Sequence, residues 1–218
     1  MNVRINFVYK AKKGIASVFE SDMMEAEKAL LIAQDLMQTG RVSRLEFIDD
    51  LERTWSIKTL TNYLINIVSE PHHIRLYFDG GFDKERQLAG LGVVIYYQQD
   101  QKAYRLRKNA LVEGLSSNNE AEYAALHLGL KELEFLGVHH MPVAILGDSL
   151  VVIKQLSDEW PVYDQVLDRW IDRIEETINK LGIHPEYQSL SRQDNKEADQ
   201  LATQALQGIQ IMSQKEID

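Results

Sequence analysis

The chain has 218 residues and a formal net charge of −9; this length suits one medium domain or a domain plus a smaller partner, and 44% hydrophobic residues are enough for a packed core. It has no cysteine, which excludes disulfides and thiolate-bound metals, so any metal must be held by oxygen or imidazole ligands. No apolar run approaches the ~20 residues of a membrane span, and the N-terminus lacks the apolar block of a signal peptide. We therefore expect a folded, cytoplasmic protein without a membrane partner, in which Mg²⁺ or Mn²⁺ is favoured over zinc.

The first 70 residues predict a small α+β module. Its predicted elements are strands at 2–9 and 15–20, a helix ending at Gly40, a strand at 41–48, and a helix with Ile57, Leu60, Leu64 and Ile67 or Val68 on its apolar face. This module, assigned to residues 1–70, carries no catalytic constellation. A role in substrate docking or in dimerisation is a hypothesis.

The rest of the chain predicts a mixed sheet with helices on both faces. The predicted strands lie at 74–79, 88–97, 102–110, 142–146 and 184–190, and the predicted helices start near 120 and 150 and cover 163–181 and 195–206. Three antiparallel strands followed by alternating helices and strands describe an α/β domain. We assign this domain to residues 71–210 and residues 211–218 to a C-terminal tail.

Two glutamates follow the polar loop SSNN at the start of the helix near residue 120. At roughly 100° per residue, Glu122 falls in line with Leu126 and Leu133, whereas Glu120 falls in line with Lys131 and the other polar positions. We therefore predict that Glu122 is buried and that Glu120 faces water. A buried carboxylate is costly unless a cation meets it there.

Three aspartates occupy positions that suit the same cation. Asp79 ends one predicted strand, Asp148 ends another directly before a helix, and Asp199 lies at the margin of the apolar face of the last helix. Each alone is more often a turn or a helix cap. With Glu122 they make four converging carboxylates, which repel one another unless divalent cations bind between them. Two such ions about 4 Å apart suit phosphodiester hydrolysis.

Four segments resemble, in order and spacing, the ribonuclease H type I family, especially its compact bacterial and archaeal branch. They are FDGG at 78–81, SSNNEAEYAAL at 116–126, GDS at 147–149 and NKEADQLA at 195–202. The resemblance covers about Ile74 to Leu206. It implies a ribonuclease H-like α/β fold with a five-stranded mixed sheet. It also implies an endonuclease that uses two Mg²⁺ ions, or Mn²⁺, to hydrolyse the RNA strand of RNA/DNA hybrids, leaving 5′-phosphate and 3′-hydroxyl ends.

The resemblance also assigns roles to individual residues. The catalytic, metal-binding carboxylates would be Asp79, Glu122, Asp148 and Asp199. Contacts to the substrate, including the 2′-hydroxyl that distinguishes RNA from DNA, would come from Gly80, Gly81, Asn118 and Asn119, with Ser149 and Arg192 as further candidates. Arg192 or Asp194 would stand where the family carries a loop histidine.

The chain departs from the family in its grip on the hybrid. Some members carry a lysine- and tryptophan-rich protrusion, whereas residues 157–163 here are short and acidic, and the net charge of the chain repels phosphate. Replacement contacts would come from Lys84, Arg86, Lys102, Arg105, Arg107 and Lys108, or from the N-terminal module, where Lys10, Lys12 and Lys13 cluster in the hairpin turn. Such a turn is also common without any ligand.

Two alternatives stay open. One is a non-catalytic nucleic-acid or partner-binding protein on the same fold. The other is a structural or regulatory protein in which the first 70 residues drive oligomerisation. No feature of the sequence specifies an oligomeric state.

Overall fold

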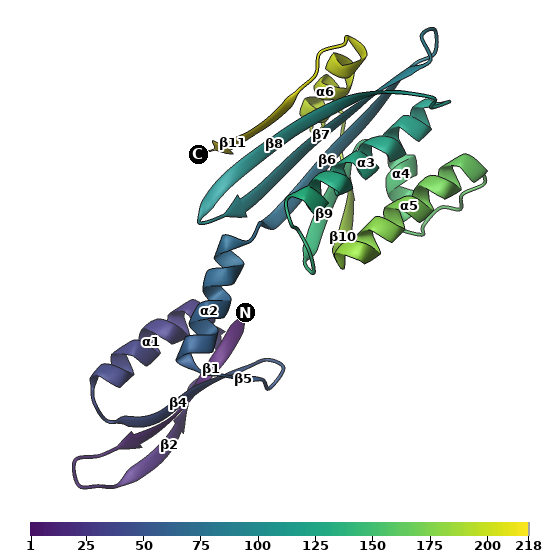
Figure 1. The fold of residues 1–218 in the computed structure, drawn as a ribbon. Helices are drawn as coiled ribbons and strands as arrows, with labels where there is room; N and C mark the ends of the chain where they lie inside the picture. The colour runs from purple at the N-terminus through teal and green to yellow at the C-terminus, as the bar shows by residue number, and fades with distance from the viewer. Residues whose placement is uncertain (218) are drawn as a thin grey trace. The chain divides into compact units, whose positions relative to one another are not determined.

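The structure, a computed structural model, describes residues 1–217 except for the side chains of residues 66–68. It divides into two compact units, the N-terminal unit Met1–Ile67 and the C-terminal unit Val68–Asp218 (Figure 1). None of its described helices is both long and apolar enough to cross a membrane.

The N-terminal unit is an antiparallel sheet in the order β2-β1-β4-β5, with β3 also paired to β1. The predicted hairpin, helices and third strand are all present. The elements are β1 (Asn2–Lys10), β2 (Ala16–Glu20), β3 (Met24–Glu25), α1 (Ala26–Gln38), β4 (Val42–Asp49), β5 (Thr54–Trp55) and α2 (Ile57–Ser69). The core is formed by Val3, Ile5 and Phe47 from the sheet with Ala29 and Leu60 from the helices. The predicted contribution of residues 67 or 68 to this face lies outside the described side chains.

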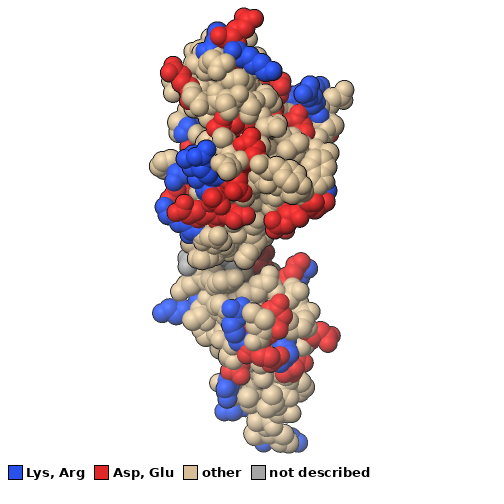
Figure 2. Space-filling model, turned by 90° about the vertical axis from the view of Figure 1, so that its right-hand side faces the viewer, with Lys and Arg blue, Asp and Glu red and all other residues tan. Residues whose placement is uncertain are grey.

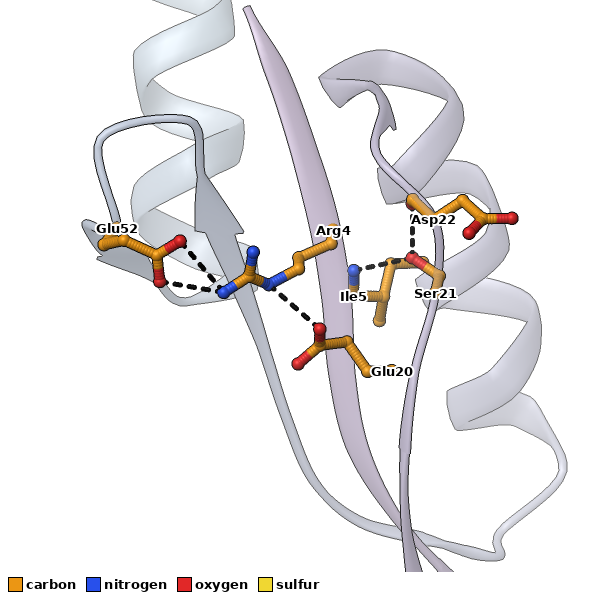
Figure 3. A network of polar contacts seen from close by, with 6 residues as sticks. All are labelled: Arg4, Ile5, Glu20, Ser21, Asp22 and Glu52. Atoms are coloured by element: carbon orange, nitrogen blue, oxygen red, sulfur yellow. Dashed lines mark hydrogen bonds and ion pairs between the residues drawn. The ribbon is translucent and has the colours of Figure 1, made fainter.

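Polar contacts link β1 to the neighbouring segments of the chain (Figure 3). Arg4 reaches Glu20 at 3.2 Å and Glu52 at 2.8 Å. The Ser21 hydroxyl accepts from the Ile5 amide at 2.9 Å. Because a register slip by one residue would turn every side chain of a strand to the other face, these contacts help to keep Val3 and Ile5 in the core.

The C-terminal unit is built on a six-stranded mixed sheet in the order β10-β9-β6-β7-β8-β11. Strands β6, β7, β8 and β11 pair antiparallel, while β9 and β10 run parallel to β6. The strands are β6 (His72–Asp83), β7 (Leu88–Gln99), β8 (Lys102–Glu113), β9 (Pro142–Gly147), β10 (His184–Ser189) and β11 (Met212–Ile217). The predicted mixed sheet is thus confirmed.

Two details of this sheet correct the sequence analysis. The segment 211–218 is not simply a tail, because Met212–Ile217 pairs with β8 as a sixth strand. Its mostly exposed residues carry no strong apolar alternation, so backbone pairing with the free edge of β8 places it. Strand β6 does not end at Asp79 either, because pairing with β7 continues to Asp83.

Helices cover both faces of the sheet (Figure 1). α3 (Asn118–Phe135), α4 (Leu150–Leu156) and α5 (Gln165–Leu181) lie on one face, and α6 (Lys196–Leu206) lies on the other. Two glycines permit close approach. A Cβ on Gly80 would stand 2.2 Å from the Ala121 carbonyl carbon of α3, and one on Gly92 would stand 2.1 Å from the Ala198 oxygen of α6. Helices α3 and α6 therefore pack closely against opposite faces of the sheet next to Asp79.

Candidate active site

The strand register places Asp79 and Asp148 side by side. The parallel pairing of β6 with β9 ends at Tyr77 opposite Leu146, and each aspartate lies two residues beyond that pair. Asp79 is 8% exposed, and the side chain of Asp148 is 13% exposed. The two carboxylates thus meet where β9 leaves β6, the kind of position where sheets of this class bind ligands.

Glu122 reaches the same place from α3. Because Gly80 has no side chain, the first turn of α3 lies directly against β6. The Gly80 amide donates to Oε2 of Glu122 at 3.1 Å, and Glu122 is 7% exposed. The prediction that Glu122 is buried is confirmed. The Gly80 amide, a predicted substrate contact, is therefore already hydrogen-bonded within the protein.

Asp79, Glu122 and Asp148 form a group whose ligand oxygens all lie within 4.8 Å of one another. Neither Asp79 nor Glu122 has an ion-pair partner among the described residues, and the cation nearest Asp148 is Arg192, with Nε 3.6 Å from Oδ2. A set of buried oxygen ligands with so little compensating charge fits a hard divalent cation. Asp199 is exposed on α6 and stands outside this group, although its charge acts on Asp79.

The carboxylates perturb one another strongly. Burial and the charges of Asp148 and Asp199 raise the pKa of Asp79 to about 7. Burial and the charges of Asp79 and Asp148 raise the pKa of Glu122 to about 9. Protons therefore occupy the cluster near neutral pH, and a cation that binds there has to displace them.

Asn195 is a buried residue that bonds to strand β6 and to Asp148 of the cluster. It is 2% exposed, and its Nδ2 donates to the Phe78 carbonyl at 2.9 Å and to Asp148 Oδ1 at 3.0 Å. One amide thus ties β6, the end of β9 and the start of α6. Sequence reasoning misses this role because an asparagine directly before a helix reads as an ordinary N-cap. Here the side chain makes no cap bond.

We expect Asn195→Asp to lower activity and divalent-ion affinity by about 10- to 100-fold, the range typical for a residue that orients a ligand. The substitution removes both amide donors and puts a further carboxylate beside Asp148. Calorimetric titration with Mg²⁺ measures the affinity. The control is Asn109→Asp, which alters a buried amide bonded to Leu201 and Ile209 instead. Equal losses in both variants would contradict a role specific to the cluster.

The predicted substrate contacts are available to different degrees. Asn118 and Asn119 are exposed, and neither amide side chain bonds to another described residue. Ser149 begins α4 without using its hydroxyl as a cap. The Arg192 side chain is 95% exposed beside Asp148. These groups, with Gly81, remain predicted substrate contacts.

The prediction that Glu120 faces water is wrong. Glu120 is 7% exposed, and its carboxylate accepts from Ser116 and from the Trp170 indole. Burial alone would raise the pKa of Glu120, but these donors hold it below the ordinary value. The helical phase was not the error. α5 packs over the face of α3 that the sequence assigned to solvent.

Several of the basic residues predicted to contact the hybrid already form ion pairs within the protein. Lys102 pairs with Glu216, and Lys108 pairs with Glu132. Arg105 and Arg107 both pair with Glu197, and Arg86 pairs with Asp83. On the face drawn in Figure 2, basic side chains lie among acidic ones instead of forming one broad basic tract. Strand β8 is therefore a weak candidate for phosphate binding.

Comparisons with known proteins agree with this geometry. The family model described as reverse transcriptase-like matches residues 77–205, more than half of the chain. The uncharacterized protein YpeP of Bacillus subtilis is 40% identical over 219 residues, covering 100% of this chain and 96% of that protein.

Two solved structures share the fold of the C-terminal unit. The N-terminal RNase H domain of Rv2228c from Mycobacterium tuberculosis is 28% identical with a TM-score of 0.54, covering 62% of this chain and 94% of that one. LC11-RNase H1, solved with an RNA/DNA hybrid, is 25% identical with a TM-score of 0.53, covering 62% and 97%. The chain therefore belongs to the reverse transcriptase-like family, as a ribonuclease H of type I.

Proposed function

We propose that this protein is a cytoplasmic, metal-dependent endonuclease that hydrolyses the RNA strand of RNA/DNA hybrids and leaves 5′-phosphate and 3′-hydroxyl ends. The observation that carries the proposal is the group of Asp79, Glu122 and Asp148, whose oxygens lie within 4.8 Å of one another at the end of β9. The hybrid bound by LC11-RNase H1 suggests the substrate class.

The group of Asp79, Glu122 and Asp148 supports a divalent cation, and we propose two Mg²⁺ ions, or Mn²⁺, with Asp199 as a fourth ligand. Bound there, such ions would activate water and stabilise the departing oxygen. The protein itself supplies orientation. Asn195 bonds Asp148, the Gly80 amide bonds Glu122, and the pairing of β6 with β9 brings Asp79 beside Asp148. Asn118 and Asn119 present free amides to the RNA strand, where a 2′-hydroxyl can be read.

The decisive experiment is cleavage of a labelled RNA/DNA hybrid in Mg²⁺ or Mn²⁺, with double-stranded RNA and DNA as comparison substrates. We expect cleavage of the RNA strand of the hybrid by the wild type and none by Asp79→Asn. Binding without turnover would favour a non-catalytic nucleic-acid-binding protein. Undiminished cleavage by Asp79→Asn would show that the cluster is not the active site.

We further propose that the N-terminal unit docks the substrate through its hairpin turn. Lys10, Lys12 and Lys13 are exposed and form no ion pair with any described residue, in contrast to the cations of β8. Lysines without an ion-pair partner can bind backbone phosphates, and this releases counterions from the nucleic acid. Such lysines therefore affect both the affinity for the hybrid and its salt dependence.

Changing all three turn lysines to glutamine is expected to raise KM for the hybrid and to make KM less sensitive to salt, with kcat nearly unchanged. Each lost phosphate contact should reduce the slope of log KM against log salt by about one. Lys28→Gln with Lys58→Gln is the control, since both are exposed lysines of the same unit outside the turn. An unaltered salt slope in the triple variant would exclude docking through this turn.

A further inference from the structure

Glu120 is a buried carboxylate outside the group of Asp79, Glu122 and Asp148. Its Oε2 accepts from the Ser116 amide and hydroxyl, each at 2.8 Å, and its Oε1 accepts from the Trp170 indole at 3.0 Å. Hydrogen bonds to an ionised acceptor are stronger than neutral ones. The start of α3 is therefore bonded through one side chain both to its own preceding loop and to α5.

The N-terminal turn of α3 is held by two sets of hydrogen bonds. Ser117 caps α3 by accepting from the Glu120 amide at 3.1 Å, while the Glu120 carboxylate reaches back to Ser116. This is a capping box in which the returning bond is made one residue earlier than usual. Asn118 and Asn119, which the sequence analysis expected in a polar loop, are the first two residues of α3, and their side chains are exposed. Their backbone is thus held while both amides stay free for a ligand.

The link to α5 is itself supported. The Trp170 ring lies edge to face with His127 at 5.7 Å, and the Arg173 guanidinium lies 4.9 Å from its centroid. These contacts favour one orientation of the indole. Asp164, at the start of α5, opposes the Glu120 charge, so the donors from Ser116 and Trp170 have to outweigh that repulsion as well as burial.

We propose that Glu120 is a positioning residue, which links Ser116 and the first turn of α3 to α5 so that Asn118 and Asn119 meet the RNA strand in a fixed geometry. This inference rests on the proposed function of the cluster. In this proposal Glu120 affects substrate recognition, whereas Glu122, two residues later, takes part in the reaction.

The test compares Glu120→Gln and Trp170→Phe in the full chain. Glutamine keeps the size of Glu120 but turns an N–H₂ group toward one of the hydrogen-bond donors. Phenylalanine at position 170 removes the indole N–H and part of the ring. We expect KM for the hybrid to rise about tenfold, the order expected when a charge-assisted hydrogen bond is lost. We expect kcat to change little. The control is Glu134→Gln on the same helix. Glu134 pairs with Lys131 and Lys180, and its replacement should leave KM unchanged.

Amide hydrogen exchange provides the second readout. In Glu120→Gln the Ser116 amide should exchange faster, because its acceptor is weakened, while core amides of α3 keep their protection. Unchanged KM in both variants would overturn the positioning role, even if Ser116 exchanges faster. If the wild type cleaves no hybrid, the proposed function fails separately. Faster Ser116 exchange would then still support the link to Ser116, and unchanged exchange would overturn it.

Discussion

Replacing Glu122 by glutamine is expected to reduce hybrid cleavage by about 100- to 1000-fold, the size seen when one electrostatic stabiliser of a transition state is lost. The same change should stabilise the metal-free fold by roughly 1–3 kcal/mol near neutral pH. The reason is that the pKa of Glu122 is raised to about 9, so the native state keeps a proton that the unfolded chain releases. Glutamine avoids that cost and can still accept from the Gly80 amide. Cleavage rates and urea unfolding in EDTA measure the two effects.

Glu120→Gln is the matched comparison, since it is the same substitution two residues earlier on the same helix. The pKa of Glu120 is lowered despite burial, because Trp170 and Ser116 donate to its ionised form. Its replacement should therefore destabilise the fold while leaving kcat nearly intact. Changes in stability of the same sign in both variants would show that the electrostatic contrast between the two glutamates is misassigned.

The stability of the metal-free protein is expected to fall as the pH rises from about 4 to about 9. The pKa of Asp79 is raised to about 7 and that of Glu122 to about 9, so the native state binds more protons than the unfolded chain across this window. Stability is therefore fully present below the unfolded pKa values and is lost as the pH passes through the folded ones. The loss should be on the order of a few kcal/mol.

Mg²⁺ should oppose this fall, because a bound cation replaces the protons of the cluster. The gain in unfolding free energy from Mg²⁺ should then grow between about pH 5 and pH 9. Urea unfolding in EDTA and in Mg²⁺ at several pH values measures it. Glu122→Gln serves as the control, with a flatter profile and a smaller gain. A gain from Mg²⁺ that does not depend on pH would mean that the ion binds elsewhere.

Most of the fold follows from local pattern. Alternation in β1, β6 and β8 and helical spacing in α5 are strong because each of these elements turns one face toward the main hydrophobic core of its unit. The pattern fails for β11, whose place depends on the open edge of β8 and not on its own residues. It also misplaces the end of β6, since Asp79-Gly80-Gly81 reads as a turn but lies within a strand beside a docked helix.

The sequence predicted the four carboxylates, the exposed pair Asn118 and Asn119 and the buried phase of Glu122, because motif order and helical period are local properties of the chain. Three further facts become visible in the folded chain: which carboxylates meet, the bonds of Asn195 to Phe78 and Asp148, and the burial of Glu120. These facts depend on strand register and on helices distant in sequence. Burial on a helix is decided by what packs against it, and α5 follows Glu120 by more than forty residues.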